Sequence, residues 1–416
     1  MKIAYYPGCS LDATAVEYGM STERTTELLG IDLWEIPDWS CCGASSAHQT
    51  SHLLALALPA RNLAIAEKAG LDVLAPCAAC YNRMRQVEHE VRDSDEIRGK
   101  VEKAIDMPYK ASQSTVSILE LFTQRYGLNN VSAKVKNPLK GMKPACYYGC
   151  LLVRPVAITG FDDPENPQSM DDIMKAVGAS PVDWAFKTEC CGAGLSVTKP
   201  NVGLNMIYRV LKNAVENGAD SIVTACPICM LNLDMRQKAI EKKFKVNFNI
   251  PIYYVTELMA VALGDKPEKA GINKHFVEAV SIFSKLPEKA KAMEAEAAAK
   301  GGKAPKAKDD EDSDEGAKPA KKAPVEKKVD AAPAKEDLPG QSGCYGKDNV
   351  QLMFALKIYE DEDKAMKLAD ILILDEARMT KLNEILEQDK AKAVKVADAL
   401  LAKAAKNSGG EEGDKA

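Results

Sequence analysis

Ten of the twelve cysteines in this 416-residue chain fall into two copies of one pattern. Each copy has one isolated cysteine, then an adjacent Cys-Cys pair followed by Gly-Ala, and then a Cys-x-x-Cys motif. In both copies 34 residues separate the pair from the motif, between positions 42 and 77 and between positions 191 and 226. Chance does not repeat residue types, spacing and neighbours together, so the sequence predicts two matched metal sites. The cysteines are Cys9, Cys41, Cys42, Cys77 and Cys80 in the first set, and Cys150, Cys190, Cys191, Cys226 and Cys229 in the second.

The number and softness of these ligands indicate the kind of metal site. Thiolates without an accompanying carboxylate or histidine favour iron–sulfur chemistry over a hard cation. Zinc takes four tetrahedral ligands, and an ordinary cubane [4Fe–4S] cluster also takes four thiolates. Each set here has five cysteines, and an adjacent pair suits a polynuclear cluster better than a single ion. We therefore expect an iron–sulfur cluster at each set.

Other uses of the cysteines remain open on this evidence. Zinc would make the protein a non-enzymatic scaffold. Disulfides are uncommon in the cytosol, and a thioredoxin-like dithiol needs only one Cys-x-x-Cys motif. Cys146 and Cys344 lie outside the repeat: Cys146 is expected in a strand, and Cys344 is unassigned. His48 and His52, near the first pair, are candidate catalytic or supporting groups, although a solvent-facing position at a helix start is the simpler interpretation.

Composition restricts the partners and the location of the protein. The net charge is −5, and no Arg/Lys-rich stripe runs among apolar residues, so nucleic acid is not an expected partner. The chain opens directly with a strand-like segment at 2–6, which leaves no room for a signal peptide. No apolar run approaches the roughly 20 residues that span a bilayer. We expect a cytoplasmic protein with no membrane span, in which thiols stay reduced.

Apolar β-branched runs alternate with longer helical patterns through both copies. This alternation is typical of an α/β fold with a parallel, doubly wound sheet in each copy. The first copy has expected strands at 3–6, 33–37 and 71–75 and helices at 13–29 and 52–69. The second has expected strands at 145–148, 182–186, 221–225 and 252–256 and helices at 170–177 and 203–216.

The expected strands place the cysteines. Cys9, Cys77, Cys150 and Cys226 each follow a strand directly. In open α/β sheets ligands gather beyond the carboxyl ends of the strands, at the switch point. The members of each set should therefore converge at one edge of a sheet.

The chain is expected to have four parts. Residues 1–140 and 141–285 form two iron–sulfur domains. Residues 286–342 are mostly Ala, Lys, Glu, Asp and Pro and cannot bury enough apolar surface to order themselves, so they are expected to be a disordered linker. Residues 343–416 are expected to form a small helical C-terminal module with a solvated tail, either an appendage or a docking module for a partner subunit.

The duplicated Cys…Cys-Cys-Gly…Cys-x-x-Cys pattern resembles the CCG domain, and its arrangement over about residues 1–285 resembles the B-type subunit of heterodisulfide reductase. The resemblance implies that each set binds one noncubane [4Fe–4S] cluster and that the two clusters face each other across the substrate. It also implies two partners, a ferredoxin-like iron–sulfur subunit of the C type and a flavoprotein subunit of the A type. The C-terminal extension is additional to the usual subunit. This departure leaves the substrate open, including the variants of bacterial sulfur metabolism.

The resemblance also implies a reaction. Splitting a disulfide takes two electrons, and two clusters that flank the bond can supply one each. The substrate would be a disulfide or a thiol, and His48, Tyr5, Tyr6 or Tyr147 are candidate proton donors. No dinucleotide-binding fingerprint follows a strand, so electrons must come from another protein. The alternatives are an electron-transfer subunit of a hydroxy-acid or glycerol-phosphate oxidoreductase, and the zinc scaffold.

Overall fold

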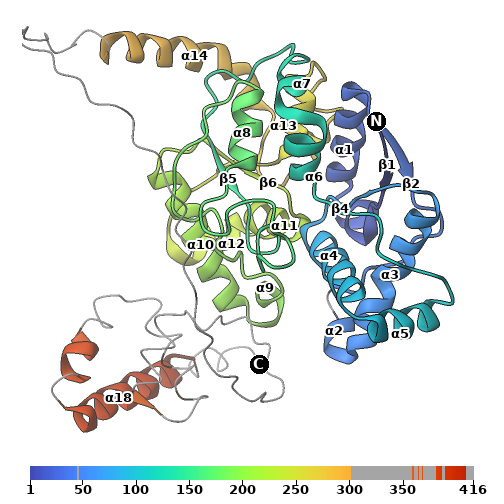
Figure 1. The fold of residues 1–416 in the computed structure, drawn as a ribbon. Helices are drawn as coiled ribbons and strands as arrows, with labels where there is room; N and C mark the ends of the chain where they lie inside the picture. Colours follow the sequence, from blue (N-terminus) through green and yellow to red (C-terminus); the bar gives the residue numbers. More distant parts are fainter. Residues whose placement is uncertain are drawn as a thin grey trace, which may run out of the picture. The chain divides into compact units, whose positions relative to one another are not determined.

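The computed structural model describes residues 1–44, 46–300, 358–359, 364, 368, 381–386 and 389–408, without the side chains of 48, 294–300 and 403–408. The chain divides into two compact units, Met1–Lys303 and Ala304–Ala416. The first unit holds both copies of the cysteine pattern (Figure 1). The fold class is the expected one: two parallel sheets with helices, one sheet in each copy.

The first copy folds around a four-stranded parallel sheet. Its elements are β1 (Lys2–Tyr5), η1 (Ser10–Thr14), α1 (Val16–Leu29), β2 (Asp32–Glu35), α2 (Ala47–Thr50), α3 (His52–Lys68), β3 (Val73–Leu74), α4 (Ala78–Asp93), α5 (Asp95–Ile105), β4 (Thr115–Val116), α6 (Ile118–Glu120), η2 (Leu121–Gly127) and α7 (Leu128–Ser132). The strand order is β2-β1-β3-β4, so the direction of winding reverses between β1 and β3. Because crossovers are right-handed, α1 lies on one face of the sheet and the group α3, α4 and α5 on the other (Figure 1). The short strand β4 was not expected from the sequence.

The second copy folds around a parallel sheet with the order β5-β6-β7. Its elements are β5 (Pro144–Tyr147), α8 (Ser169–Ala176), α9 (Leu195–Thr198), α10 (Pro200–Glu216), β6 (Ser221–Thr224), α11 (Pro227–Met235), α12 (Gln237–Phe244), β7 (Ile252–Tyr254), α13 (Val255–Ala262) and η3 (Ile272–Lys274). These bounds agree with the expected strands at 145–148, 221–225 and 252–256.

The expected strand at 182–186 is wrong, because no strand is assigned to these residues. Val182 N donates to the Pro144 carbonyl at 3.0 Å, as a neighbouring parallel strand would. Trp184 then packs against β5, and its indole Nε1 donates to the Cys146 carbonyl at 3.1 Å. The indole N–H thus uses the carbonyl that would accept from a backbone N–H of a neighbouring parallel strand, so the strand pairing with β5 does not continue. The apolar pattern of this segment reflects the burial of Trp184.

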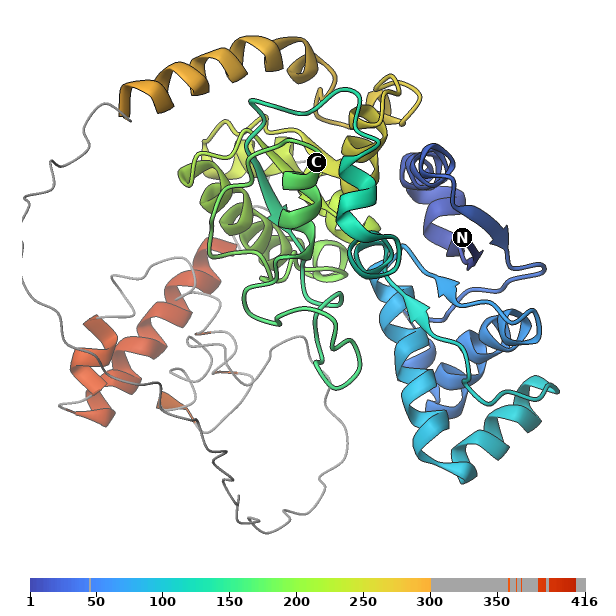
Figure 2. The ribbon, with the colours of Figure 1, turned by 45° about the horizontal axis from the view of Figure 1, so that its top comes forward.

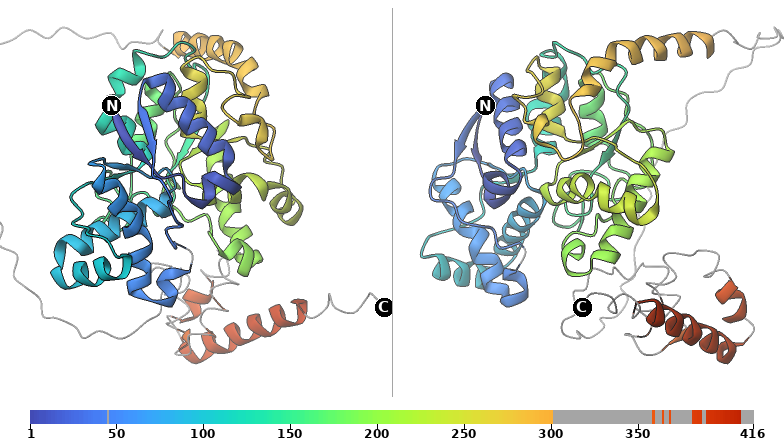
Figure 3. Two further views of the ribbon diagram at one scale, coloured as in Figure 1. Left: turned by 90° about the vertical axis from the view of Figure 1, so that its right-hand side faces the viewer. Right: turned by 180° about the vertical axis from the view of Figure 1, so that it is seen from behind.

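Helices of one copy pack against helices of the other. Helix α1 packs against α13 of the other copy, and α6 packs against α8 (Figure 3). The corresponding helices α6 and α13 begin alike: the Glu120 carboxylate accepts from Ser117 N at 2.8 Å, and the Glu257 carboxylate accepts from Tyr254 N at 2.8 Å. The duplication therefore extends to features that contain no cysteine.

A buried cluster of charged side chains lies near the C-terminal end of the second copy. His275 Nε2 lies 2.8 Å from Glu257 Oε1, and its Nδ1 lies 3.6 Å from Asp234 Oδ2. Asp234 also accepts from the backbone N–H groups of Phe276 and Val277 at 2.8 and 2.9 Å. Burial alone would lower the pKa of His275, but the two carboxylates outweigh it and raise that pKa to about 10. The ring is therefore cationic at neutral pH and anchors the segment after η3.

The first unit ends in helix α14 (Ser281–Lys300), which extends away from the body of the unit (Figure 2). Residues 286–300 of the expected linker are thus helical, in keeping with their Ala, Glu and Lys content. The rest of the linker and Cys344 lie outside the described residues. None of the described helices has the length and apolar character needed to cross a membrane.

In the second unit, the described part includes helix α18 (Lys390–Ser408). Tyr359 Oη donates to Asp398 Oδ1 at 2.7 Å. A small apolar cluster joins the described residues of this unit, as expected for a helical module. It consists of Ile358, Tyr359, Leu368, Leu382, Ala393 and Ala397.

Candidate metal centres

The first set of thiols converges at the switch point of the first sheet. Cys9 follows β1, and Cys77 follows β3 and precedes α4, which carries Cys80. The Sγ atoms of Cys9 and Cys41 lie 3.9 Å apart, and those of Cys42 and Cys80 lie 3.2 Å apart. Cys9 and Cys41 are exposed, whereas the remaining three are buried.

The second set repeats this pairing. Cys190 is the strongest influence on the pKa of the Cys150 thiol, which it raises, and Cys229 is the strongest influence on the pKa of the Cys191 thiol, which it lowers, so the same partners are neighbours here. Within each Cys-x-x-Cys motif the two thiols are also neighbours: Cys226 raises the pKa of Cys229, as Cys77 raises the pKa of Cys80. Cys150 and Cys190 are only partly exposed, so the second set is the more enclosed of the two.

A glycine in a left-handed conformation lets the chain approach each set closely. Gly8 has φ +64° and Gly149 has φ +65°, and each directly precedes the isolated cysteine of its set. A Cβ atom on Gly8 would lie 3.4 Å from Cys80 Sγ, and one on Gly149 would lie 3.1 Å from Cys229 Sγ. Glycine is therefore required at both positions by backbone conformation and by space.

A second matched glycine follows each Cys-Cys pair. Gly43 has φ +70° and Gly192 has φ +83°. Gly43 N lies 3.4 Å from Cys41 Sγ, and Gly192 N lies 3.3 Å from Cys190 Sγ. These backbone N–H groups donate to sulfur, which stabilises negative charge on the two thiolates.

Burial and neighbouring thiols shift the pKa values of several cysteines in the two sets. The contact with Cys80 lowers the pKa of Cys42 to about 7, and the contact with Cys150 lowers the pKa of Cys190 to about 7. Burial and Cys41 raise the pKa of Cys9 to about 11. A metal must displace the retained protons, so its uptake should be favoured by rising pH.

Of the tyrosines suggested as proton donors, Tyr6 and Tyr147 have structural partners, whereas the buried Tyr5 hydroxyl has no hydrogen-bond partner among the described residues. Tyr6 Oη donates to the Ser40 carbonyl at 2.8 Å, and Tyr147 Oη donates to the Glu189 carbonyl at 2.5 Å. Both carbonyls belong to the residue before the Cys-Cys pair, so these bonds hold the two matched loops. Burial raises the pKa of Tyr5, Tyr6 and Tyr147 far above its ordinary value, which makes them poor acids.

The two histidines near the first pair differ in what is described. The side chain of His48 lies outside the described residues, so its proposed role stays a prediction. His52 is exposed, and its Nε2 lies 3.0 Å from Glu90 Oε2. This contact places His52 on the outside of helices α3 and α4.

Asparagines on neighbouring helices fix the loops that carry the Cys-Cys pairs. In the first copy, Asn62 of α3 accepts from Ser40 N and donates to the Ser40 carbonyl, both at 2.9 Å. In the second, Asn232 of α11 donates to the Cys191 carbonyl at 3.2 Å and contacts Cys191 Sγ at 3.5 Å. The sequence reasoning missed both residues; a polar side chain on the apolar face of a helix was the available signal.

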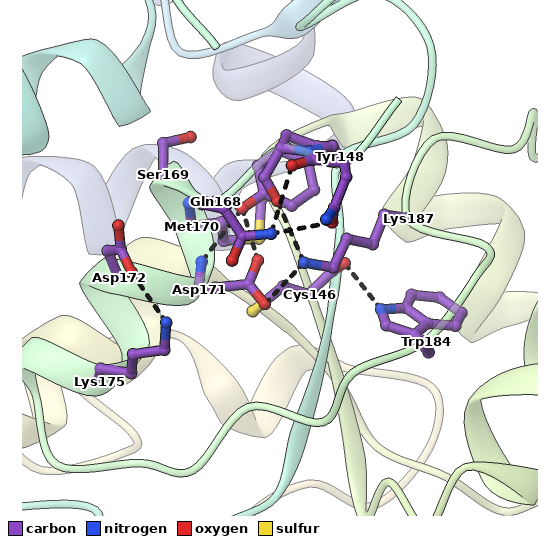
Figure 4. Close-up of polar contacts among 12 residues, drawn as sticks. Cys146, Tyr148, Gln168, Ser169, Met170, Asp171, Asp172, Lys175, Trp184 and Lys187 are labelled. Atoms are coloured by element: carbon purple, nitrogen blue, oxygen red, sulfur yellow. Dashed lines mark hydrogen bonds and ion pairs between the residues drawn. The ribbon is translucent and has the colours of Figure 1, made fainter. Parts of the chain in front are cut away.

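One buried polar group supports the loop of the second set (Figure 4). Lys187 Nζ lies 3.0 Å from Asp171 Oδ1, and Tyr148 Oη donates to Asp171 Oδ2 at 2.6 Å. The Lys187 carbonyl also accepts from the N–H groups of Tyr148 and Gly149 at 2.8 and 3.1 Å. The loop before Cys190 is thereby tied to the turn before Cys150.

The described residues of the first copy hold nothing equivalent. Asp38 stands in the place of Lys187, three residues before the pair (38 against 41, 187 against 190), and its side chain is 87% exposed. Cys146 lies buried in β5, close to Asp171 and Lys187 (Figure 4). Burial raises the pKa of the Cys146 thiol, in keeping with its expected place in a strand.

The donor set fits an iron–sulfur cluster. In each copy, thiols from three separate segments gather beyond the strand ends, and a backbone N–H points at a sulfur. Among the described residues, no group of His, Cys, Asp or Glu side chains is arranged to hold a single metal ion. When bound, such a cluster would supply one-electron redox chemistry at each set.

Known proteins share these features. A model of a family described as "Cysteine-rich domain" (CCG) matches residues 3–85 and 145–234, one match in each copy. The chain is 33% identical to the 8-methylmenaquinol:fumarate reductase membrane anchor subunit of Wolinella succinogenes, over 68% of this chain and 99% of that protein. It is 29% identical to the B-type subunit of a CoB-CoM heterodisulfide reductase of Methanosarcina acetivorans, over 68% and 97% of the two chains.

A solved structure shares the fold. A hypothetical protein from Helicobacter pylori aligns with a TM-score of 0.55 at 16% identity, over 67% of this chain and 52% of that one. At this identity the likeness concerns the fold alone. All of these matches leave part of the chain uncovered.

Proposed function

The chain belongs to the family of duplicated cysteine-rich (CCG) proteins that includes the B-type subunit of heterodisulfide reductase, and from this premise we propose that it is the catalytic iron–sulfur subunit of a heterodisulfide reductase-like complex. Its substrate is a disulfide or a related sulfur compound, cleaved or formed with one electron exchanged at each set. The observation that carries the proposal is the repetition of the same thiol pairs in both copies.

Each set of five cysteines would hold one noncubane [4Fe–4S] cluster. The first would use Cys9, Cys41, Cys42, Cys77 and Cys80, and the second Cys150, Cys190, Cys191, Cys226 and Cys229. Five thiolates exceed the four that a cubane takes, which supports the noncubane type. The N–H groups of Gly43 and Gly192 would stabilise the sulfur charge, and the turns at Gly8 and Gly149 would leave room for the buried thiols.

The exposed thiols indicate how a substrate would reach the sets. Cys9 and Cys41 are open to solvent, and Cys150 and Cys190 are partly so, while the Cys-x-x-Cys motifs are buried. A sulfur substrate would therefore approach the side of each set that carries the isolated cysteine and the first cysteine of the pair. The buried motif on the other side would keep water from that part of the site.

Electrons and protons would come from outside the described side chains. A ferredoxin-like subunit and a flavoprotein subunit are the proposed electron carriers, and the name of the Methanosarcina relative supports such a multisubunit assembly. The proposed location is the cytoplasm, where the ten thiols would stay reduced. Since the tyrosines near the sets are poor acids, the protons would come from solvent at the exposed thiols.

A second candidate function is electron transfer without sulfur chemistry. The Wolinella relative, named as a subunit of a quinol:fumarate reductase, favours this alternative. In that case both sets would only relay electrons, and neither would respond to a thiol.

One experiment separates the two functions. The protein is purified without oxygen, and its electron paramagnetic resonance is recorded after mild oxidation, with and without a small thiol. A new, thiol-dependent signal supports the disulfide chemistry. A cluster signal that no thiol alters would move the assignment to electron transfer.

A further inference from the structure

One tyrosine hydroxyl lies between the two sets of cysteines. Tyr18 Oη is 3.1 Å from the Pro76 carbonyl and 3.3 Å from the Ala225 carbonyl. These two residues are equivalent: each ends the segment that follows a central strand and directly precedes the first cysteine of a Cys-x-x-Cys motif, Cys77 or Cys226. A single hydroxyl thus joins the backbone of one set to the backbone of the other.

The duplication does not account for this residue. The helix that corresponds to α1 in the second copy is α8, which contains no tyrosine; Thr159, at the same distance from the isolated cysteine as Tyr18 (18 against 9, 159 against 150), lies outside any helix. Thr159 Oγ1 donates to the Pro155 carbonyl of its own copy at 3.2 Å. Tyr18 of the first copy therefore contributes the side chain that reaches the pair of strand-end carbonyls.

The surrounding contacts hold the Tyr18 ring in place. Tyr18 is fully buried, and its ring stacks on Tyr254 of the other copy with centroids 4.0 Å apart and planes 2° from parallel. One turn further along α1, Ser21 Oγ lies 2.7 Å from Thr256 Oγ1, and two turns along, Thr25 Oγ1 donates to the Thr256 carbonyl at 2.8 Å. The ring cannot move without breaking the contact between α1 and α13.

We propose that Tyr18 is a positioning residue that fixes the distance between the two sets of cysteines, and with it the gap that a sulfur substrate must bridge. The inference rests on the proposed function, because the gap matters only when both sets carry clusters. Without the hydroxyl, the Pro76 and Ala225 carbonyls lose their shared donor and two like dipoles face each other. The strand ends, and the cysteines that follow them, then move apart.

The test is Tyr18→Phe, which removes the hydroxyl and keeps the stacked ring. Two variants at the same contact between the two copies serve as matched controls. Tyr254→Phe removes a buried hydroxyl that has no hydrogen-bond partner among the described residues. Ser21→Ala removes a buried hydrogen bond between the copies that does not touch a cysteine strand end.

Iron content and the magnetic interaction between the reduced clusters are measured for all four proteins. We expect the same iron content in all four proteins. The splitting of the paramagnetic resonance signal that the two interacting clusters cause in the wild type should be lost in Tyr18→Phe and kept in both controls. The inference is overturned if Tyr18→Phe keeps the wild-type splitting, or if Ser21→Ala loses it equally. Iron-free wild-type protein would refute the proposed function instead.

A second measurement needs no iron. In the metal-free protein, bifunctional thiol reagents of increasing length link the exposed thiols of the first set to the partly exposed thiols of the second, and mass spectrometry maps the products. We expect Tyr18→Phe to shift the preferred reagent to a longer one, with both controls like wild type. An unchanged preference in Tyr18→Phe would overturn the inference even if that variant failed to take up iron.

Discussion

The two copies hold the same thiols in the same pairs but support them differently. In the first copy the loop before the pair is exposed at Asp38, and Asn62 of α3 holds its end. In the second, the corresponding loop is anchored in the interior by Lys187 and Asp171, which are 2% and 4% exposed. The first set also has two exposed thiols where the second has two that are only partly exposed.

This difference shows which parts of the site the duplication preserves. The strand ends, the left-handed glycines and the tyrosine bonds to the loop carbonyl recur in both copies, because they decide where the sulfur atoms lie. The side chains behind the loops differ, because several arrangements can hold a loop at the same place. We expect the second set to be the more rigid and the first to be the more accessible.

The largest expected effect comes from the buried pair of the second copy. Replacing Lys187 with Met leaves Asp171 buried without its cation, which should cost about 3 to 5 kcal/mol of unfolding free energy. Denaturant unfolding measures this, with Asp38→Asn as the matched change in the first copy. Because Asp38 is exposed, its replacement should change stability by less than about 1 kcal/mol.

The double variant Lys187→Met/Asp171→Leu distinguishes charge from packing. Removing both charges should recover most of the lost stability. Equal losses for Lys187→Met and Asp38→Asn would contradict the contrast between the two copies.

His275 makes the stability of the second copy depend on pH, and the described side chains of the first copy include no buried histidine. Its pKa is raised in the folded protein to about 10 from an ordinary value of 6.5, so the stabilisation is complete below pH 6.5 and disappears as the pH rises through 10. His275→Gln should cost about 2 kcal/mol at pH 7, the scale of a hydrogen bond to a charged group. Unfolding at several pH values should show the difference from wild type shrinking as the pH rises; a constant difference would count against a charged His275.

The two glycine turns allow a matched pair of substitutions. Gly149→Ala and Gly8→Ala each place a side chain at positive φ, which should cost about 1 to 2 kcal/mol. In the second copy the new methyl group meets Cys229 Sγ at 3.1 Å, whereas in the first it meets the Tyr6 ring at 3.0 Å and Cys80 Sγ only at 3.4 Å, so the direct pressure on a sulfur is greater in the second. We expect iron loss from both variants and a greater loss from Gly149→Ala, measured as iron per chain after mild chelation. The reverse order would mean that the contact with the Tyr6 ring, and not the contact with sulfur, decides the loss of iron.

Cys146→Ala should have the smallest effect. This thiol lies in β5 and takes no part in the pairs, so its loss should leave iron per chain unchanged and cost about 1 kcal/mol of stability for the small cavity. A drop in iron would make Cys146 a ligand and would break the match between the two sets.

The features that repeat in both copies could be predicted from the sequence. Cysteine spacing, glycine after each pair and the strands before Cys9, Cys77, Cys150 and Cys226 predicted two sheets with the thiols at their carboxyl edges. The sequence was not sufficient where a side chain replaces a backbone contact, as Trp184 does where a strand was expected. Nor could it place Asn62, Asn232 or Tyr18, since contacts between distant helices leave no local pattern.

The most direct test of the central claim, two matched sites with a cluster in each, is iron and sulfide per chain in three proteins purified without oxygen. These are the wild type, Cys42→Ser and Cys191→Ser, the last two lacking equivalent buried thiols. We predict about eight irons in the wild type, four for each cluster, and about half as many in each variant. About four irons in the wild type, all lost in one variant and kept in the other, would contradict the account.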